Sequence, residues 1–148
     1  MADDATVVSQ VTVLPDEIAQ TISTTTTVSP ADANDKWYYK LTSVTNTSGN
    51  LILGENYIDY TASSSVSNTV DAADLVKFLY VKNTDSTNDV YIALDGDTVT
   101  TSLGDAIKVG AGQALSIQIP NTTVDNLHAV TSTGTVECIV AALLDDVA

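Results

Sequence analysis

Histidine and cysteine carry much of the chemistry that proteins do at neutral pH, and this chain holds one of each, His128 and Cys138. A Ser-His-Asp arrangement needs a nucleophile held beside the histidine. His128 lies in an alternating stretch that predicts a solvent-facing strand residue, and the sequence has no Gly-x-Ser-x-Gly elbow. A zinc site takes about four clustered ligands, more than one Cys and one His supply. Cys138 stands in an apolar run that predicts a buried thiol. We therefore expect no catalytic residues and a protein that is not an enzyme.

Acidic side chains in turns are the other groups that could do chemistry. Asp85 and Asp89 belong to one polar turn, and Asp95 and Asp97 flank Gly96 in the next. Hard cations such as calcium bind oxygen-rich turns of this kind. Neither turn matches the Asp-x-Asp-x-Asp-Gly loop of an EF-hand, and the turn preferences of Asp, Asn and Gly explain both without metal. We expect no metal and no cofactor, with calcium at these four aspartates as the alternative.

The net charge of the chain excludes some classes of binding partner. Nineteen acidic residues stand against five lysines and no arginine, which gives a net charge of −14 and a pI of about 4.1. Such a surface repels nucleic acid and anionic membranes, so we expect neither as a partner. The N-terminus lacks the basic and apolar segments of a signal peptide. We therefore expect synthesis in the cytoplasm of the producing cell.

Extended segments dominate the chain and must position any site. Thr, Val and Ile are frequent, alternation of apolar and polar residues recurs, and no helix is indicated. The predicted strands are 7–14, 18–28, 37–45, 51–53, 57–62, 75–82, 90–94, 107–109, 114–119, 127–131 and 136–144, with a short extended piece at Val99. Their spacing is close to that of an antiparallel sandwich or barrel. We predict a single compact domain overall. It consists of an all-β, jelly-roll-like antiparallel β-sandwich over residues 36–148, preceded by an extended N-terminal arm with edge strands over 1–35.

Two details of this prediction concern the central strands. In 75–82, alternation places Val76, Phe78 and Tyr80 on one face and Leu79 and Val81 on the other. Proline lacks a backbone donor, so the strand that begins at residue 114 is expected to end at Pro120.

Interface candidates come from apolar side chains that such a fold leaves near its edges. Val7, Val11 and Val13 share one face of the first strand, and Trp37 and Tyr39 share one face of the strand that follows the arm. Aromatic side chains are common anchors of protein interfaces. We therefore expect a homo-oligomer that uses these five residues. A sugar-binding platform formed by the aromatic residues of the first half is the alternative.

Three segments of the second half carry a family resemblance. They read VKFLYVKN at 76–83, VYIALDG at 90–96 and IKVGAGQALSI at 107–117. This succession of strand, polar turn, strand and glycine turn resembles small virion proteins of tailed bacteriophages, over residues 75–144. The resemblance implies a β-sandwich module without catalytic residues.

Within that family, the resemblance implies a capsid decoration, or cement, protein on the exterior of the phage head. Its partners would be the major capsid protein and further copies of itself, by analogy with symmetric shells as a homotrimer, and its role would be to stabilise the head. The alternative is a module of a tail or head fibre that binds a receptor or glycan through the loops 83–89 and 121–126.

Overall fold

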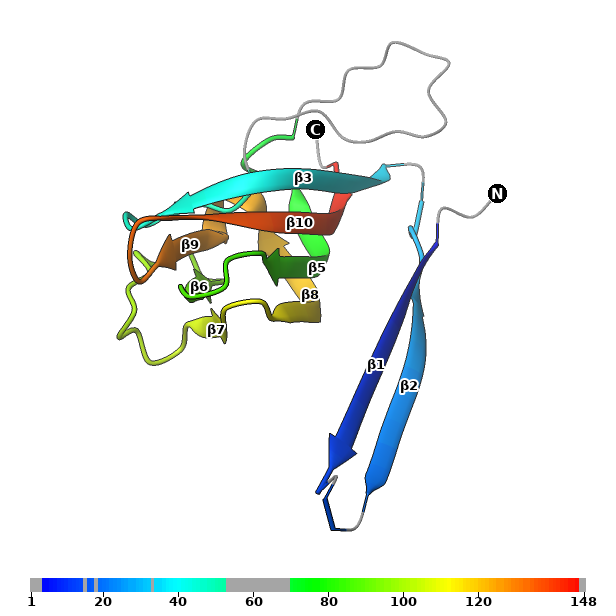
Figure 1. The fold of residues 1–148 in the computed structure, drawn as a ribbon. Coiled ribbons are helices and arrows are strands. Elements are labelled where there is room, and N and C mark those ends of the chain that lie inside the picture. Colours follow the sequence, from blue (N-terminus) through cyan, green and yellow to red (C-terminus); the bar gives the residue numbers. More distant parts are fainter. Residues whose placement is uncertain (1–3, 15, 18, 33, 53–69, 147–148) are drawn as a thin grey trace. The chain divides into compact units, whose positions relative to one another are not determined.

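The computed structural model describes residues 4–14, 16–17, 19–32, 34–52 and 70–146 (Figure 1). The chain divides into two compact units, Met1–Asp32 and Ala33–Ala148. The predicted boundary between arm and sandwich lay between residues 35 and 36. The predicted strand 57–62 falls outside the described residues.

The second unit is built from two four-stranded antiparallel sheets. The long-strand sheet has the order β3-β10-β5-β8, and the short-strand sheet has the order β4-β9-β6-β7. The bounds are β3 Asp35–Thr45, β4 Gly49–Asn50, β5 Leu75–Asn83, β6 Val90–Ala93, β7 Ile107–Val109, β8 Ala114–Thr123, β9 His128–Thr131 and β10 Thr135–Asp145, with a 3-10 turn, η1, at Val124–Asn126. Strands alternate between the sheets except for β6 and β7, which gives the eight-stranded jelly roll. The predicted all-β sandwich is confirmed.

The core lies between the two sheets because alternate residues of each strand face inward. β10 contributes every second residue from Val136 to Leu144, and β5 contributes Val76, Leu79 and Val81. The short-strand sheet contributes Val90, Ile92, Val109 and Ala129 to the same core. Among the described residues, no helix is long and apolar enough to cross a membrane.

A β-bulge at Lys77 corrects the predicted faces of β5. Leu143 of β10 pairs with Phe78 and Leu144 with Val76, so Lys77 has no opposite residue in that ladder. A bulge inserts one residue and shifts the alternation. Val76 therefore enters the core with Leu79, whereas the even pattern had placed it on the face of Phe78.

Three other strand predictions differ from the structure. β8 continues through Pro120 to Thr123. It is an outer strand of its sheet as the described residues define it, and the register shifts opposite Lys77, so the missing donor of proline is tolerated there. Leu51 and Val99 are buried but lie outside strands, since loop residues can also fill the core.

The first unit is a two-stranded antiparallel hairpin, β1 Ala5–Val13 with β2 Gln20–Val28. Opposite residues of such a pair share a face. The nine cross-strand pairs therefore sort into two faces. We call one the apolar face, made of Ala5, Val7, Ser9, Val11, Val13, Gln20, Ile22, Thr24, Thr26 and Val28. The other, the hydroxyl face, carries Thr, Ser and Gln side chains and Val8.

Candidate interaction surfaces

The apolar face of the hairpin is exposed toward its turn. Val11 and Ile22 lie directly opposite each other and are 58% and 66% exposed, and Val13 is two residues farther along β1. A lone hairpin has no second layer to bury such side chains, and an isolated two-stranded hairpin is at best marginally stable in water. The hairpin therefore presents a cluster of branched apolar side chains that another surface would stabilise.

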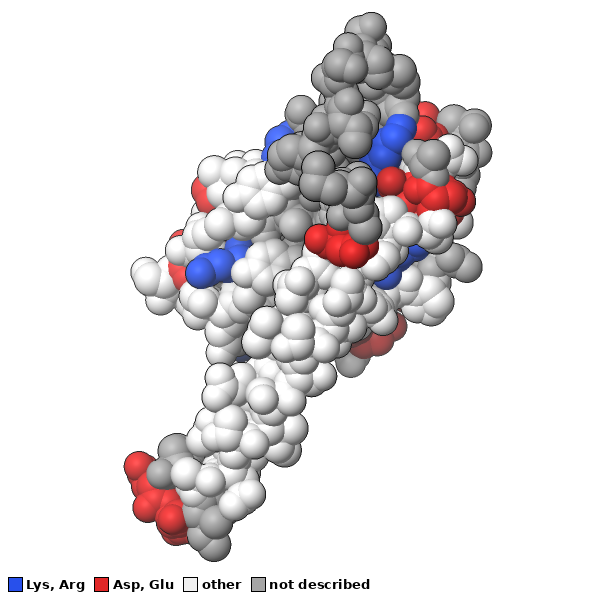
Figure 2. All heavy atoms as spheres, turned by 90° about the vertical axis from the view of Figure 1, so that its right-hand side faces the viewer, with Lys and Arg blue, Asp and Glu red and all other residues white. Residues whose placement is uncertain are grey.

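Charge is absent from the strands of this hairpin. Neither β1 nor β2 contains an acidic or basic residue, although the chain carries 24 of them, 19 acidic and five basic. Asp16 and Glu17 follow in the turn, and acidic atoms gather at that end of the hairpin (Figure 2). The hairpin thus has an uncharged stem and an acidic tip.

A second uncharged surface lies on the outer side of the long-strand sheet. Tyr39 and Leu41 point away from the core there, and each is 57% exposed. Pairing places Ala141 and Tyr80 beside Tyr39, and Ile139 beside Leu41. These five residues are called the aromatic face from here on.

The neighbours of the aromatic face are of three kinds. In the row beyond Leu41 and Ile139, Glu137 of β10 is exposed and accepts a hydrogen bond from Ser43. In the row beyond Tyr39, Trp37 packs edge-on against Phe78, with ring centroids 6.1 Å apart. In the row of Leu41, Lys82 stands at the rim and is exposed. Within the part of the chain that the structure describes, Lys82 forms no ion pair, whereas Lys77 and Lys108 are both paired with aspartates.

The five predicted interface residues thus fall on two surfaces. Val7, Val11 and Val13 share the apolar face of the hairpin, and Trp37 and Tyr39 share the outer side of β3. The five predicted interface residues do not include Ile22 and Leu41. Leu41 continues the period of two from Trp37 and Tyr39 and could have been found, but Ile22 is assigned to the face of Val11 only by the register of the hairpin.

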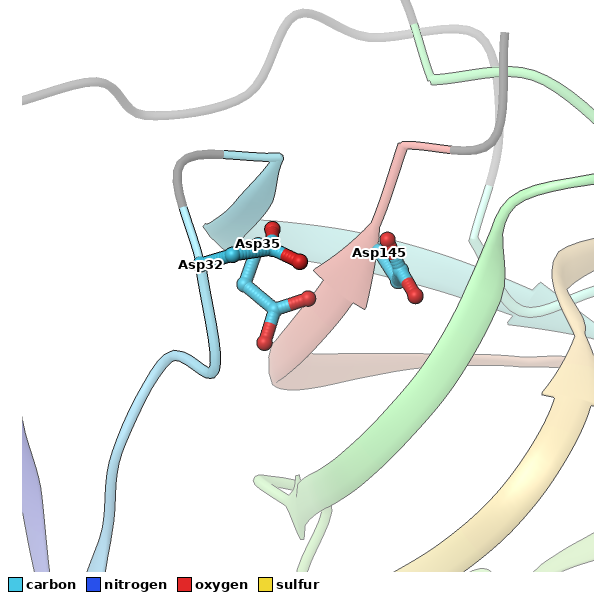
Figure 3. A group of neighbouring side chains, drawn as sticks. All are labelled: Asp32, Asp35 and Asp145. Carbon is cyan, nitrogen blue, oxygen red and sulfur yellow. The ribbon is translucent and has the colours of Figure 1, made fainter.

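One buried and two partly buried charges lie where β3, β5 and β10 meet. Lys77 Nζ lies 2.8 Å from Asp35 Oδ1 and 2.9 Å from Asp145 Oδ2. Figure 3 shows the two carboxylates, which come from paired ends of β3 and β10. The hydrogen bond to Asp35, and then that to Asp145, raises the pKa of Lys77. This group stabilises the junction of three strands.

Asp85 and Asp89, the first pair of candidate calcium ligands, form bonds within the protein. Asp85 Oδ1 accepts the N–H groups of Thr87 and Asn88 at 2.7 Å each, which lowers the pKa of Asp85. Lys108 lies 2.7 Å from Asp89 and lowers its pKa in turn. Among the described residues, these two aspartates form no cluster of three possible metal ligands.

The second pair of aspartates is likewise placed in a turn. Asp95 Oδ1 accepts the N–H of Asp97 at 3.2 Å, and the Asp97 carbonyl accepts a bond from His128 Nδ1 at 2.8 Å. Where the structure describes the chain, neither aspartate belongs to a cluster of three possible metal ligands. His128 is thus a partly buried strand residue that bonds to backbone.

Asn83 organises the first of these turns. Its side chain is fully buried, and Nδ2 donates to the carbonyls of Asn88 and Val109 at 2.8 and 3.3 Å. Its Oδ1 accepts the N–H of Asp85 at 2.9 Å. The asparagine of the KN motif therefore has a structural role that ties the turn to β7.

No protein-family model matches the chain, and no curated protein matches it. Among solved structures, it is similar to the coat protein of tobacco streak virus. That alignment covers 80% of this chain and 92% of that chain, with 7% identity and a TM-score of 0.37. A likeness this low does not indicate a shared function. The class that the geometry itself defines is an eight-stranded jelly roll with an N-terminal β-hairpin.

Proposed function

We propose that this chain is a structural protein of a virus particle, of the capsid decoration type, that binds the outside of a phage head and stabilises it. The observation that carries the proposal is the hairpin with its uncharged, exposed apolar face, which is suited to contact protein. The part of the proposal that names a phage head rests on the sequence resemblance over residues 75–144.

Charge supports the outer side of a shell. A chain of net charge −14 is repelled by packaged nucleic acid, so the lumen is unfavourable and the exterior is not. The partners under this proposal are the major capsid protein and further copies of this chain, as a homotrimer on a symmetric shell.

The proposal also includes the absence of enzyme activity. The groups that would do chemistry are engaged in structural bonds: Lys77 with Asp35, Asp85 with its turn, and His128 with a backbone carbonyl. Cys138 is fully buried in the core. Asn83 and Asp85, in the loop considered for glycans, have side chains bonded within that turn.

The copy number of the protein in purified particles tests this function. Quantitative mass spectrometry against the major capsid protein should give on the order of hundreds of copies per particle, because decoration follows the many equivalent positions of a shell. A few copies would contradict decoration and point to a tail, neck or fibre. Absence from the particle would overturn the virion role altogether.

Stabilisation of the head is a separate measurement. A ligand that binds only the assembled state stabilises that state. Particles without the protein should therefore release their genome at a lower temperature, and adding purified protein back should restore the release temperature. Unchanged release with the protein bound would contradict the cement role.

A further inference from the structure

We propose that the apolar face of the hairpin of one copy docks on the aromatic face of a second copy. The inference deepens the proposed homo-oligomer and rests on it only for the symmetry of the final assembly. Its donor residues are Val11, Val13 and Ile22, and its acceptor residues centre on Tyr39 and Leu41. The contact is head to tail, because the two surfaces differ.

Exposure within one chain is the first argument. Ile22 is 66% exposed on the hairpin and Leu41 is 57% exposed on the sandwich, so neither unit buries these side chains with its own strands. Clusters of large apolar side chains of this kind mark sites of association. Both clusters are present in every copy, which makes a second copy a sufficient partner for each.

Charge is the argument for a second copy over other partners. Two copies of a chain with net charge −14 repel each other through most of their surface. A self-contact avoids this repulsion where both sides are uncharged, and both strands of the hairpin and the five residues of the aromatic face are uncharged. A basic partner would instead be expected on an acidic surface.

The lengths of the two apolar clusters and the charges beside them are the third argument for this contact. Val11 and Val13 are two residues apart on β1, as Tyr39 and Leu41 are on β3, so the two clusters have the same length of roughly 7 Å along a strand. The tip beyond Val13 is acidic, and the rim beside Leu41 carries Lys82 without an ion pair among the described residues. Docking would bring the acidic tip near Lys82 at this rim, where the exposed Glu137 of the next row is hydrogen-bonded to Ser43.

A head-to-tail contact has a consequence for symmetry. Interfaces of this kind close into rings or continue as filaments, whereas a face-to-face contact stops at a dimer. A closed ring of three copies would use three identical contacts. The inference therefore supplies a geometric route to the proposed trimer.

Sedimentation of the purified full-length protein over a concentration series tests the contact. The unmodified protein should associate. The donor variant Val11→Thr with Ile22→Thr should associate at least about tenfold more weakly, because it removes apolar anchors from the centre of the contact. Val8→Thr is the matched control, since Val8 is 69% exposed on the hydroxyl face, and it should leave association unchanged.

The acceptor is tested by Leu41→Lys, which should weaken association by a similar factor. Ser116→Lys is its control, because Ser116 is exposed on β8, an outer strand of the same sheet in its described part, and lies in the row of Tyr39 without belonging to the aromatic face. Circular dichroism and thermal unfolding should show native folds for all variants, whose substituted side chains are exposed.

Mixing the two variants decides between head-to-tail docking and other arrangements. The intact hairpin of the Leu41→Lys protein should dock on the intact aromatic face of the donor variant. The mixture should then form one-to-one dimers and nothing larger, while each variant alone stays monomeric over the same concentrations. A mixture without dimers would overturn the proposal.

Two further results would also overturn it. One is an unmodified protein that stays monomeric at every concentration, which would leave the shell or the chain's own sandwich as the cover of the hairpin. The other is equal weakening by Val8→Thr and by the donor variant. Neither result bears on the copy number in particles, so failure of this contact is distinguishable from failure of the decoration role.

Discussion

Lys77 Nζ lies 2.8 Å from Oδ1 of Asp35, whose side chain has no exposed surface. Lys77 is the extra residue of the bulge in β5, since it has no opposite residue in the ladder with β10. Asp145 of β10 is the second partner, at 2.9 Å. One lysine thus joins β3, β5 and β10 at one end of the long-strand sheet.

Replacing this lysine should destabilise the sandwich. Lys77→Met removes the cation that lies 2.8 Å from the buried Asp35 carboxylate, and breaking a buried pair costs about 3–5 kcal/mol. Because the Lys77 side chain is 28% exposed, we expect a loss of about 2–3 kcal/mol in the free energy of unfolding, measured with urea. Lys108→Met is the control, since Lys108 is largely exposed and its loss should change little. Equal effects of both changes would contradict the assignment.

The same pair predicts a dependence on alkaline pH. The carboxylates raise the pKa of Lys77 above its ordinary 10.5 in the folded state. Its contribution is therefore complete below about pH 10.5 and is lost as the pH rises through the folded pKa. The difference in unfolding free energy between the unmodified protein and Lys77→Met should shrink above that pH. A constant difference would mean that Lys77 acts by packing alone.

Asn83 should be a second stability determinant. Asn83→Ala removes the partners of two carbonyls and one N–H group, and we expect a loss of about 2–4 kcal/mol in unfolding free energy. Thr87→Ala is the control, because that exposed residue contributes its backbone N–H to the same turn. Faster amide hydrogen exchange at Asp85 in Asn83→Ala would locate the loss. Unchanged exchange there would contradict the role of Asn83 in this turn.

The sequence predicted the class of fold because strand periodicity is local. Strict alternation identified β8, and apolar runs identified β5 and β10, without any knowledge of their neighbours. The bulge at Lys77 is not local: it depends on how β10 and β8 pair with β5, and it moved Val76 to the core. For the same reason Pro120 was misread, since its tolerance follows from the outer position of β8.

The interaction surfaces were predictable only in part. The period of two grouped Val7 with Val11 and Val13, and Trp37 with Tyr39. The register that adds Ile22 to the first group, and the sheet order that places β10 beside β3, are long-range pairings. A sequence read segment by segment does not contain them.

Calcium should not stabilise the folded protein. Oδ1 of Asp85 accepts two backbone N–H groups, and Asp89 is paired with Lys108. A cation would have to displace these bonds, and ligand binding raises the unfolding temperature only when the folded state binds it. We expect the same unfolding temperature with calcium and with a chelator. A higher unfolding temperature in calcium than in chelator, with the difference lost in Asp95→Ala, would contradict this expectation.

Cys138 should be inert in the native protein. It is fully buried in β10, and burial, followed by the nearby charge of Glu137, raises the pKa of its thiol to about 11. At pH 7 only about one thiol in ten thousand would then be ionised, and the thiolate is the reactive form. A thiol reagent such as Ellman's should react slowly with the folded protein and rapidly in denaturant. The variant Ser116→Cys offers an exposed thiol on β8 as an internal reference, and its native-state reaction should be fast. Equal rates at both positions would show that β10 opens readily and that the core of the long-strand sheet is not closed.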